Sequence, residues 1–125
     1  MMDYQKLFDG KTHEEAVEIL RNIQGEREFL EQIIELAHLL QWRVAHFRPA
    51  RTATGWRTPC QADAAGWPDL VLVKGNRLLF RELKTSTGKL TAAQRDWLAA
   101  LEAAGQDAKV YRPGDWPDIE RELRA

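Results

Sequence analysis

Apolar residues at helical spacing predict two helices in the first third of the chain. Residues 12–23 carry one apolar face, and Thr12 and Glu15 have the spacing of a capping box at its start. Gly25 is a typical helix end, and residues 26–40 carry a second apolar face. The members of this second face are Phe29, Ile33, Leu36, Ala37 and Leu40.

Strand-like segments follow the two helices. Alternating side chains at 42–47 predict one strand, and apolar runs at 70–73 and 78–83 predict two more. The Gly-Asn pair at 75–76 is a two-residue hairpin signal between those runs. Residues 48–67 have no periodicity and contain two prolines and two glycines. We therefore expect a long loop there, of the kind that is usually functional or mobile.

The last third of the chain alternates helix and strand again. Thr91 begins a helix that Gly105 is expected to end, residues 108–111 form a short strand, and Asp115 and Pro117 open a final helix. Helices alternating with strands predict the α/β class, and a length of 125 residues fits one domain.

The composition narrows the setting of the protein. A composition of 44% hydrophobic and 30% charged residues is typical of a folded, soluble chain. No apolar run is long enough to span a bilayer, so we expect no membrane partner. The first residues lack a secretory signal, and the single cysteine, Cys60, excludes an internal disulfide and a zinc site built from several cysteines. We expect a cytoplasmic protein (in the host cytoplasm, for a phage-encoded one) in which Cys60 is a bystander.

The predicted hairpin brings two carboxylates together. With the turn at 75–76, residues whose numbers sum to 151 lie opposite each other, so Asp69 faces Glu82 with Cβ atoms about 4.5–5.5 Å apart. Two like charges so placed destabilise the hairpin unless a cation lies between them, and oxygen ligands suit Mg²⁺ or Mn²⁺. Lys84 points to the same face, where an ammonium stabilises charge on a phosphate.

This constellation predicts metal-assisted hydrolysis of a phosphodiester. The alternative is that Asp69 follows Pro68 in an ordinary turn, and that Glu82 and Lys84 form a solvated strand face. The apolar neighbours Phe80 and Leu83 argue against a solvated strand.

Three separated motifs resemble one nuclease family. Asp69 after Pro68, followed by Glu82 and Lys84, resembles the PD-(D/E)xK nuclease signature. Residues 66–73 (GWPDLVLV), 79–84 (LFRELK) and 90–97 (LTAAQRDW) resemble, in order, the motifs of its VRR-NUC domain branch, which includes small stand-alone phage proteins and structure-specific DNA repair nucleases. The resemblance covers about 26–113, so we expect an N-terminal helical extension at 1–25 and a nuclease domain at 26–125.

The resemblance implies a restriction-endonuclease-like core of order αβββαβ, a mixed sheet flanked by helices, here with an extra N-terminal helix. It also implies a Mg²⁺ or Mn²⁺ ion on Asp69, Glu82 and the backbone carbonyl of Leu83, with Lys84 as the catalytic lysine. A further acid is implied on the helix before the first strand. We choose Glu28, because Gln32 lies one turn on, ahead of Glu26, Glu31 and Glu35.

Several single residues have two interpretations. Gln94 either completes a capping box with Thr91 or contacts water or phosphate at the active site, as the resemblance implies. Asp118 repeats the Trp-Pro-Asp triplet but fits an acid in the first turn of a helix. Trp56 and Trp67 either stack on unpaired bases or pack on the sheet, and packing is favoured for Trp67, which lies next to Pro68. The helix at 12–23 either covers the sheet, forms a dimer contact or binds a partner.

The resemblance favours a DNA nuclease, an endonuclease in preference to an exonuclease, acting on branched, nicked or junction DNA and leaving a 3′-hydroxyl and a 5′-phosphate. A nuclease that cuts both strands is expected to act as a symmetric homodimer. One alternative is a nucleic-acid-binding module that keeps the fold without the activity. Another is a protein–protein adaptor that uses the N-terminal helix.

The net charge of −1 hides two unlike parts. Residues 43–95 contain ten Lys and Arg against three acids, a net charge of +7, and the remainder carries −8. A basic segment around the carboxylates can contact phosphates, which predicts modest, strongly salt-dependent DNA affinity. The expected DNA contacts are Arg43, His46, Arg48, Arg51, Arg57, Lys74, Arg77 and Lys89.

Overall fold

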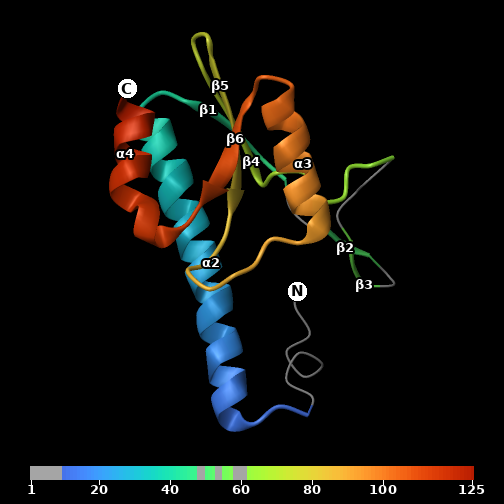
Figure 1. Ribbon diagram of the computed structural model, residues 1–125. Coiled ribbons are helices and arrows are strands. Elements are labelled where there is room, and N and C mark those ends of the chain that lie inside the picture. Colours follow the sequence, from blue (N-terminus) through green and yellow to red (C-terminus); the bar gives the residue numbers. More distant parts are fainter. Residues whose placement is uncertain (1–9, 48–49, 53–54, 58–61) are drawn as a thin grey trace.

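A four-stranded mixed sheet flanked by helices forms the body of the protein (Figure 1). The computed structural model describes residues 10–47, 50–52, 55–57 and 62–125, so that Arg48 and Cys60 lie outside the described residues. The elements are, in chain order, α2 (His13–Leu39), β1 (Arg43–His46), β2 (Ala50–Thr52), β3 (Gly55–Arg57), β4 (Leu70–Lys74), β5 (Arg77–Leu83), α3 (Ala92–Ala103), β6 (Asp107–Tyr111), the 3₁₀ helix η1 (Pro113–Asp115) and α4 (Trp116–Arg124). The α/β class and the mixed sheet are thereby confirmed.

One long helix replaces the two that the apolar pattern predicts. α2 begins as expected, with the Thr12 hydroxyl accepting the Glu15 N–H at 3.1 Å, but it continues through Gly25. A glycine weakens a helix interior by about 1 kcal/mol, and it ends a helix only where the chain then turns away. That turn comes at Gln41, with φ of 70°, where the Trp42 N–H donates to the Ala37 carbonyl at 2.9 Å.

The predicted hairpin register is confirmed. β4 and β5 are antiparallel, from Leu70 opposite Arg81 to Lys74 opposite Arg77, and Gly75 turns with φ of 60°. β1 lies antiparallel to β4 on one side, and β6 lies parallel to β5 on the other, giving the order β1-β4-β5-β6.

The expected loop at 48–67 contains regular structure. β2 and β3 pair as a short antiparallel hairpin, with Ala50 opposite Arg57. Strands of three residues are too short to leave a periodic pattern in the sequence. The hairpin forms its own two-stranded sheet between β1 and β4 in the chain.

The two faces of the main sheet carry different helices. Alternate side chains of β4 and β5, including Leu70, Leu72 and Leu79, form the core with Ile33 of α2 and Ile119 of α4. Figure 1 shows α2 and α4 together on one side of the sheet and α3 on the other. The intervening side chains, including those of residues 69, 80 and 82, therefore face α3.

Candidate active site

Asp69 is held between two neighbouring strands. It directly precedes β4, and its backbone carbonyl accepts the Phe47 N–H at 3.1 Å. Its carboxylate accepts the Leu83 N–H from β5 at 2.8 Å. The β4–β5 register, continued by one residue, places Asp69 opposite Glu82 as predicted. Asp69 is thus fixed against β5 and is not a free turn residue.

Glu82 is a buried carboxylate, only 2% exposed. Burial raises its pKa to about 8, and the charge and side-chain hydrogen bond of Asp69 act in the same direction, whereas the ammonium of Lys84 and a backbone hydrogen bond at Asp69 oppose the shift. Both acids are therefore ionised together only at a high energetic cost. A divalent cation between them relieves this cost.

Gln94 completes the capping box, one of the two interpretations that the sequence left open, and it also contacts the candidate metal ligand Glu82. Its Oε1 accepts the Thr91 N–H at 2.9 Å, and its own N–H donates to the Thr91 hydroxyl at 3.2 Å, which completes the capping box of α3. Its side-chain Nε2 donates to Glu82 Oε1 at 3.0 Å. One amide oxygen caps the helix while the amide nitrogen holds the buried acid, so the two roles do not exclude each other.

Lys84 begins the connection between β5 and α3. Its N–H donates to the Tyr111 carbonyl at 3.1 Å, which extends the sheet past the end of β5. The segment after it is held by Arg112, whose guanidinium donates to the carbonyls of Thr85 at 2.6 Å and Gly88 at 2.7 Å. Arg112 was not predicted from the sequence, because it reaches this segment only through the parallel β5–β6 pairing.

An aromatic cluster lies beside the carboxylates on the α3 side. The Trp67 ring meets Phe80 and Trp97 edge to face, with ring centroids 5.6 Å and 5.0 Å away. Phe47 meets Trp67 in the same manner at 6.5 Å. The packing interpretation of Trp67 is thus confirmed.

Gly66 allows this cluster to approach α3. It has a φ of 86°, and a Cβ at this position would lie 2.6 Å from the carbonyl carbon of Ala93. The indole N–H of Trp97 donates to the Asp63 carbonyl at 2.8 Å, which holds the same loop from the other side. Glycine is therefore required where the loop meets the start of α3.

Glu28 lies on α2 with an exposed side chain, as do Glu26, Glu31 and Glu35. α2 packs through Phe29 and Ile33 on the sheet face opposite Glu82. Among the described residues, no three or more His, Cys, Asp or Glu side chains gather into a metal-binding group. The structure therefore does not bring Glu28 together with Asp69 and Glu82.

Two of the expected DNA contacts lie on the other face of the sheet. Lys74 and Arg77 both lie over the Trp42 ring, 5.9 Å and 4.8 Å from its centroid. Arg77 also donates to the carbonyls of Glu122 at 3.1 Å and Ala125 at 2.8 Å, at the end of α4. Arg77 thus ties the hairpin to the end of α4, and both cations lie on the sheet face away from the candidate site.

The other expected DNA contacts are distributed over the molecule. Lys89 is exposed in the segment between β5 and α3, and Arg43 is exposed on the edge strand β1. His46 is half-buried at the end of β1. The side chains of Arg51 and Arg57, like the whole of Arg48, lie outside the described part of the chain.

The carboxylate pair has the donor chemistry of a hard divalent cation. Mg²⁺ is commonly held by one or two carboxylates together with waters and substrate phosphate, so two acids suffice without a third. Asp69 and Glu82 meet this requirement, and the unfavourable burial of Glu82 next to Asp69 supports the fit.

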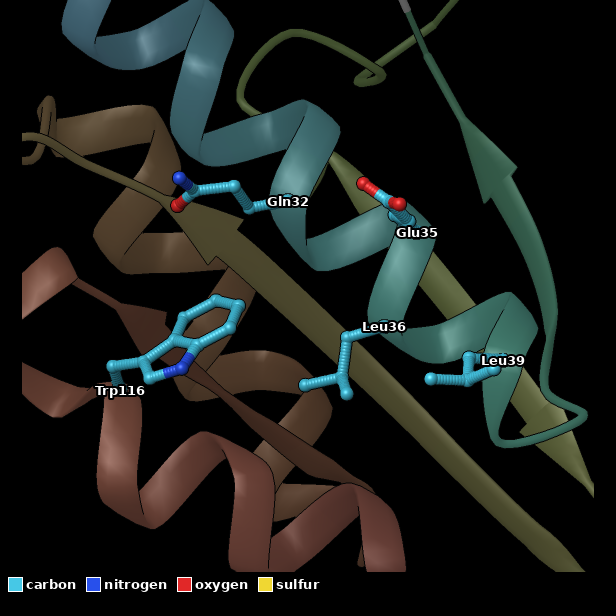
Figure 2. Close-up of a pocket in the computed structure, with 5 residues that line it drawn as sticks. All are labelled: Gln32, Glu35, Leu36, Leu39 and Trp116. Carbon is cyan, nitrogen blue, oxygen red and sulfur yellow. The ribbon is translucent and has the colours of Figure 1, made fainter.

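A separate open groove lies between α2 and the start of α4 (Figure 2). It is lined by Gln32, Glu35, Leu36, Leu39 and Trp116. This groove is on the helical layer opposite α3, away from the carboxylate pair. Within the described ranges, the structure contains no helix that is both long and apolar enough to cross a bilayer.

The comparison with protein families agrees with the motifs. A family model described as VRR-NUC domain matches residues 10–113. The match includes the whole of α2 and so begins earlier than the range of about 26–113 that the motifs cover, while α4 lies beyond it. No curated protein and no solved structure is significantly similar to the chain.

Proposed function

The chain belongs to the VRR-NUC domain family, whose members have a nuclease-like fold, and on that premise we propose that it is a metal-dependent nuclease that hydrolyses DNA phosphodiester bonds. The observation that carries the proposal is the Asp69–Glu82 pair, in which a 2% exposed glutamate is held beside an aspartate on the neighbouring strand. A buried pair of like charges is unfavourable in a purely structural role. It is well suited to binding a cation.

The order α2-β1-β4-β5-α3-β6 supports the assignment of a PD-(D/E)xK-like core. In this assignment β2 and β3 are an insertion between the first two core strands, and α4 is an addition at the C-terminus.

Each residue of the site has a role in the proposal. Asp69 and Glu82 would hold Mg²⁺ or Mn²⁺ together with the carbonyl of Leu83, and the ion when bound would polarise the phosphate as a Lewis acid. Lys84 would position the attacking water and place a positive charge near the phosphate. Gln94 would hold Glu82 in place through its hydrogen bond.

The reaction is a hydrolysis. The water oxygen bonds to phosphorus, the bond from phosphorus to the 3′-oxygen breaks, and the water proton passes to solvent while the leaving oxygen takes up another. The products are a 3′-hydroxyl and a 5′-phosphate. Branched, nicked and junction DNA are the substrates that we propose to test first.

The experiment compares cleavage of plasmid, single-stranded and four-way-junction DNA with Mg²⁺, with Mn²⁺ and with EDTA. We expect cleavage with a metal and none in EDTA. Asp69→Asn and Glu82→Gln should each lower the rate by at least about a hundredfold, since each removes a charge from the metal site.

Asp118→Asn is the matched control for these variants. It removes a carboxylate of α4 that is exposed and bonded to Arg121, so it should leave cleavage unchanged. Tight binding without metal, and without cleavage of any substrate, would favour a non-catalytic binding module instead.

A further inference from the structure

Phe47 is an exposed aromatic residue immediately beside the carboxylate pair. It is 47% exposed and lies just after the end of β1. Among the described residues, the other exposed large hydrophobic side chains are the aliphatic Leu39, Val73 and Leu78. An exposed aromatic ring at this position offers a flat apolar face on which a base can stack.

The strand register places Phe47 in one row with the two acids. β1 and β4 are antiparallel with His46 opposite Leu70, so Phe47 is opposite Asp69, and the Phe47 N–H donates to the Asp69 carbonyl at 3.1 Å. Opposite residues share a face and have Cβ atoms about 4.5–5.5 Å apart. The row across the sheet is therefore Phe47, Asp69 and Glu82.

The ring is held in place by its edge-to-face contact with Trp67, at an interplanar angle of 89°. Trp67 is itself fixed between Phe80 and Trp97. Phe47 is thus supported on one side by a packed aromatic cluster, while almost half of the residue remains exposed.

We infer that Phe47 stacks on an unpaired base next to the phosphate bound at Asp69 and Glu82, which directs the site toward DNA with unpaired nucleotides. The inference rests on the proposed nuclease function and deepens it. Every base has a π face, so stacking on an aromatic ring does not require a particular sequence. Inside a duplex each base is already stacked on both sides, so a protein ring reaches a base without the energetic cost of unstacking it only at an end, gap, flap or junction.

The test measures binding in EDTA with the Glu82→Gln protein as background, so that cleavage does not enter the readout. Two labelled single strands of about twelve nucleotides are compared by fluorescence anisotropy, one with ordinary bases and one in which every residue is abasic. The two strands share the same phosphates. Phe47→Leu should weaken binding of the ordinary strand roughly tenfold and leave binding of the abasic strand unchanged.

Two further variants complete the design. Phe47→Trp should restore the affinity for the ordinary strand, since it restores an aromatic face. Leu78→Ala changes an exposed aliphatic residue on the same sheet face near the hairpin turn, and it should bind both strands like the background protein.

Equal effects of Phe47→Leu on the two strands, or none on either, would overturn the inference. If the wild-type protein cleaves DNA but Phe47→Leu shows no base-dependent loss, only this inference fails. If the base-dependent loss is found and the wild-type protein cleaves no substrate, the nuclease proposal fails and the stacking role of Phe47 stands.

Discussion

At the residue scale, Glu82 is the side chain of the candidate site whose surroundings are most unusual. It is almost fully buried, it faces Asp69, and it accepts a hydrogen bond from Gln94. Burial and the charge of Asp69 raise its pKa, so the protonated form is favoured when no cation is bound.

The stability of the metal-free protein should therefore depend on the protonation of Glu82. Above pH 4.5 the unfolded state releases a proton that the folded glutamate keeps until the pH passes about 8. The contribution of Glu82 to the free energy of unfolding is thus fully present at low pH and is lost over this window. The loss is at most about 1.4 kcal/mol per pH unit.

Urea unfolding in EDTA across this window should show the effect as a difference between the wild type and Glu82→Gln, whose amide does not titrate. Added Mg²⁺ should stabilise the wild type most at the high end of the window, where both acids are ionised. Parallel stability curves for the two proteins would contradict the prediction.

At the scale of the element, β5 serves two functions through its two faces. Glu82 points toward α3, and its neighbour Arg81 points the other way, where it is fully buried. Arg81 donates to the carboxylates of Asp107 and Glu122, both at 2.8 Å. Glu122 also bonds to the Tyr111 hydroxyl. The strand that carries the candidate metal ligand is in this way tied to β6 and α4.

Loss of Glu122 should destabilise the whole domain. Glu122→Gln leaves the buried Arg81 with Asp107 alone as a charged partner, and we expect a loss of about 3 kcal/mol in the free energy of unfolding, measured with urea. Asp118→Asn breaks an exposed pair with Arg121 on the same helix, so its effect should be below about 1 kcal/mol. Similar losses in the two variants would show that the buried pair of Arg81 and Glu122 contributes no more to the free energy of unfolding than an exposed pair does.

At the scale of the whole molecule, the basic residues of the segment at 43–95 do not all lie on the side of the candidate site. Arg77 and Arg81 are bonded to α4 and do not face the candidate site. Lys84 acts electrostatically on Glu82, and Lys89 is exposed in the connection that follows Lys84. The positive charge that can meet DNA is therefore smaller than the net value of +7 suggests.

Loss of a positive charge should weaken DNA binding only where that charge lies on the side of the candidate site. Lys89→Gln should weaken binding of DNA to the inert Glu82→Gln protein and lower the slope of log K against log salt by about 1. Arg121→Gln removes an exposed cation from α4, so its affinity and slope should match those of the Glu82→Gln protein. Anisotropy titrations at several salt concentrations measure both quantities, and an equal change in the two variants would contradict a one-sided DNA surface.

The extent to which the sequence predicted the fold differs between elements for physical reasons. The β4–β5 hairpin was predictable because a two-residue turn sets the register of both strands. The single helix α2 was not predictable, because a glycine ends a helix only where the chain then turns away. The chain does not turn at Gly25 but at Gln41, just before Trp42 packs into the core. The β2–β3 hairpin was too short for a periodic signal.

Local chemistry along the chain was enough to determine the family, the hairpin and the pairing of Asp69 with Glu82, since all three depend on neighbouring residues or on one tight turn. Only the tertiary structure decided the rest. It placed Phe47 beside Asp69, joined Gln94 to Glu82, and turned Arg77 and Arg81 toward α4. These contacts join elements separated by long connections, and it is the packing of the sheet faces, not a local pattern, that sets their geometry.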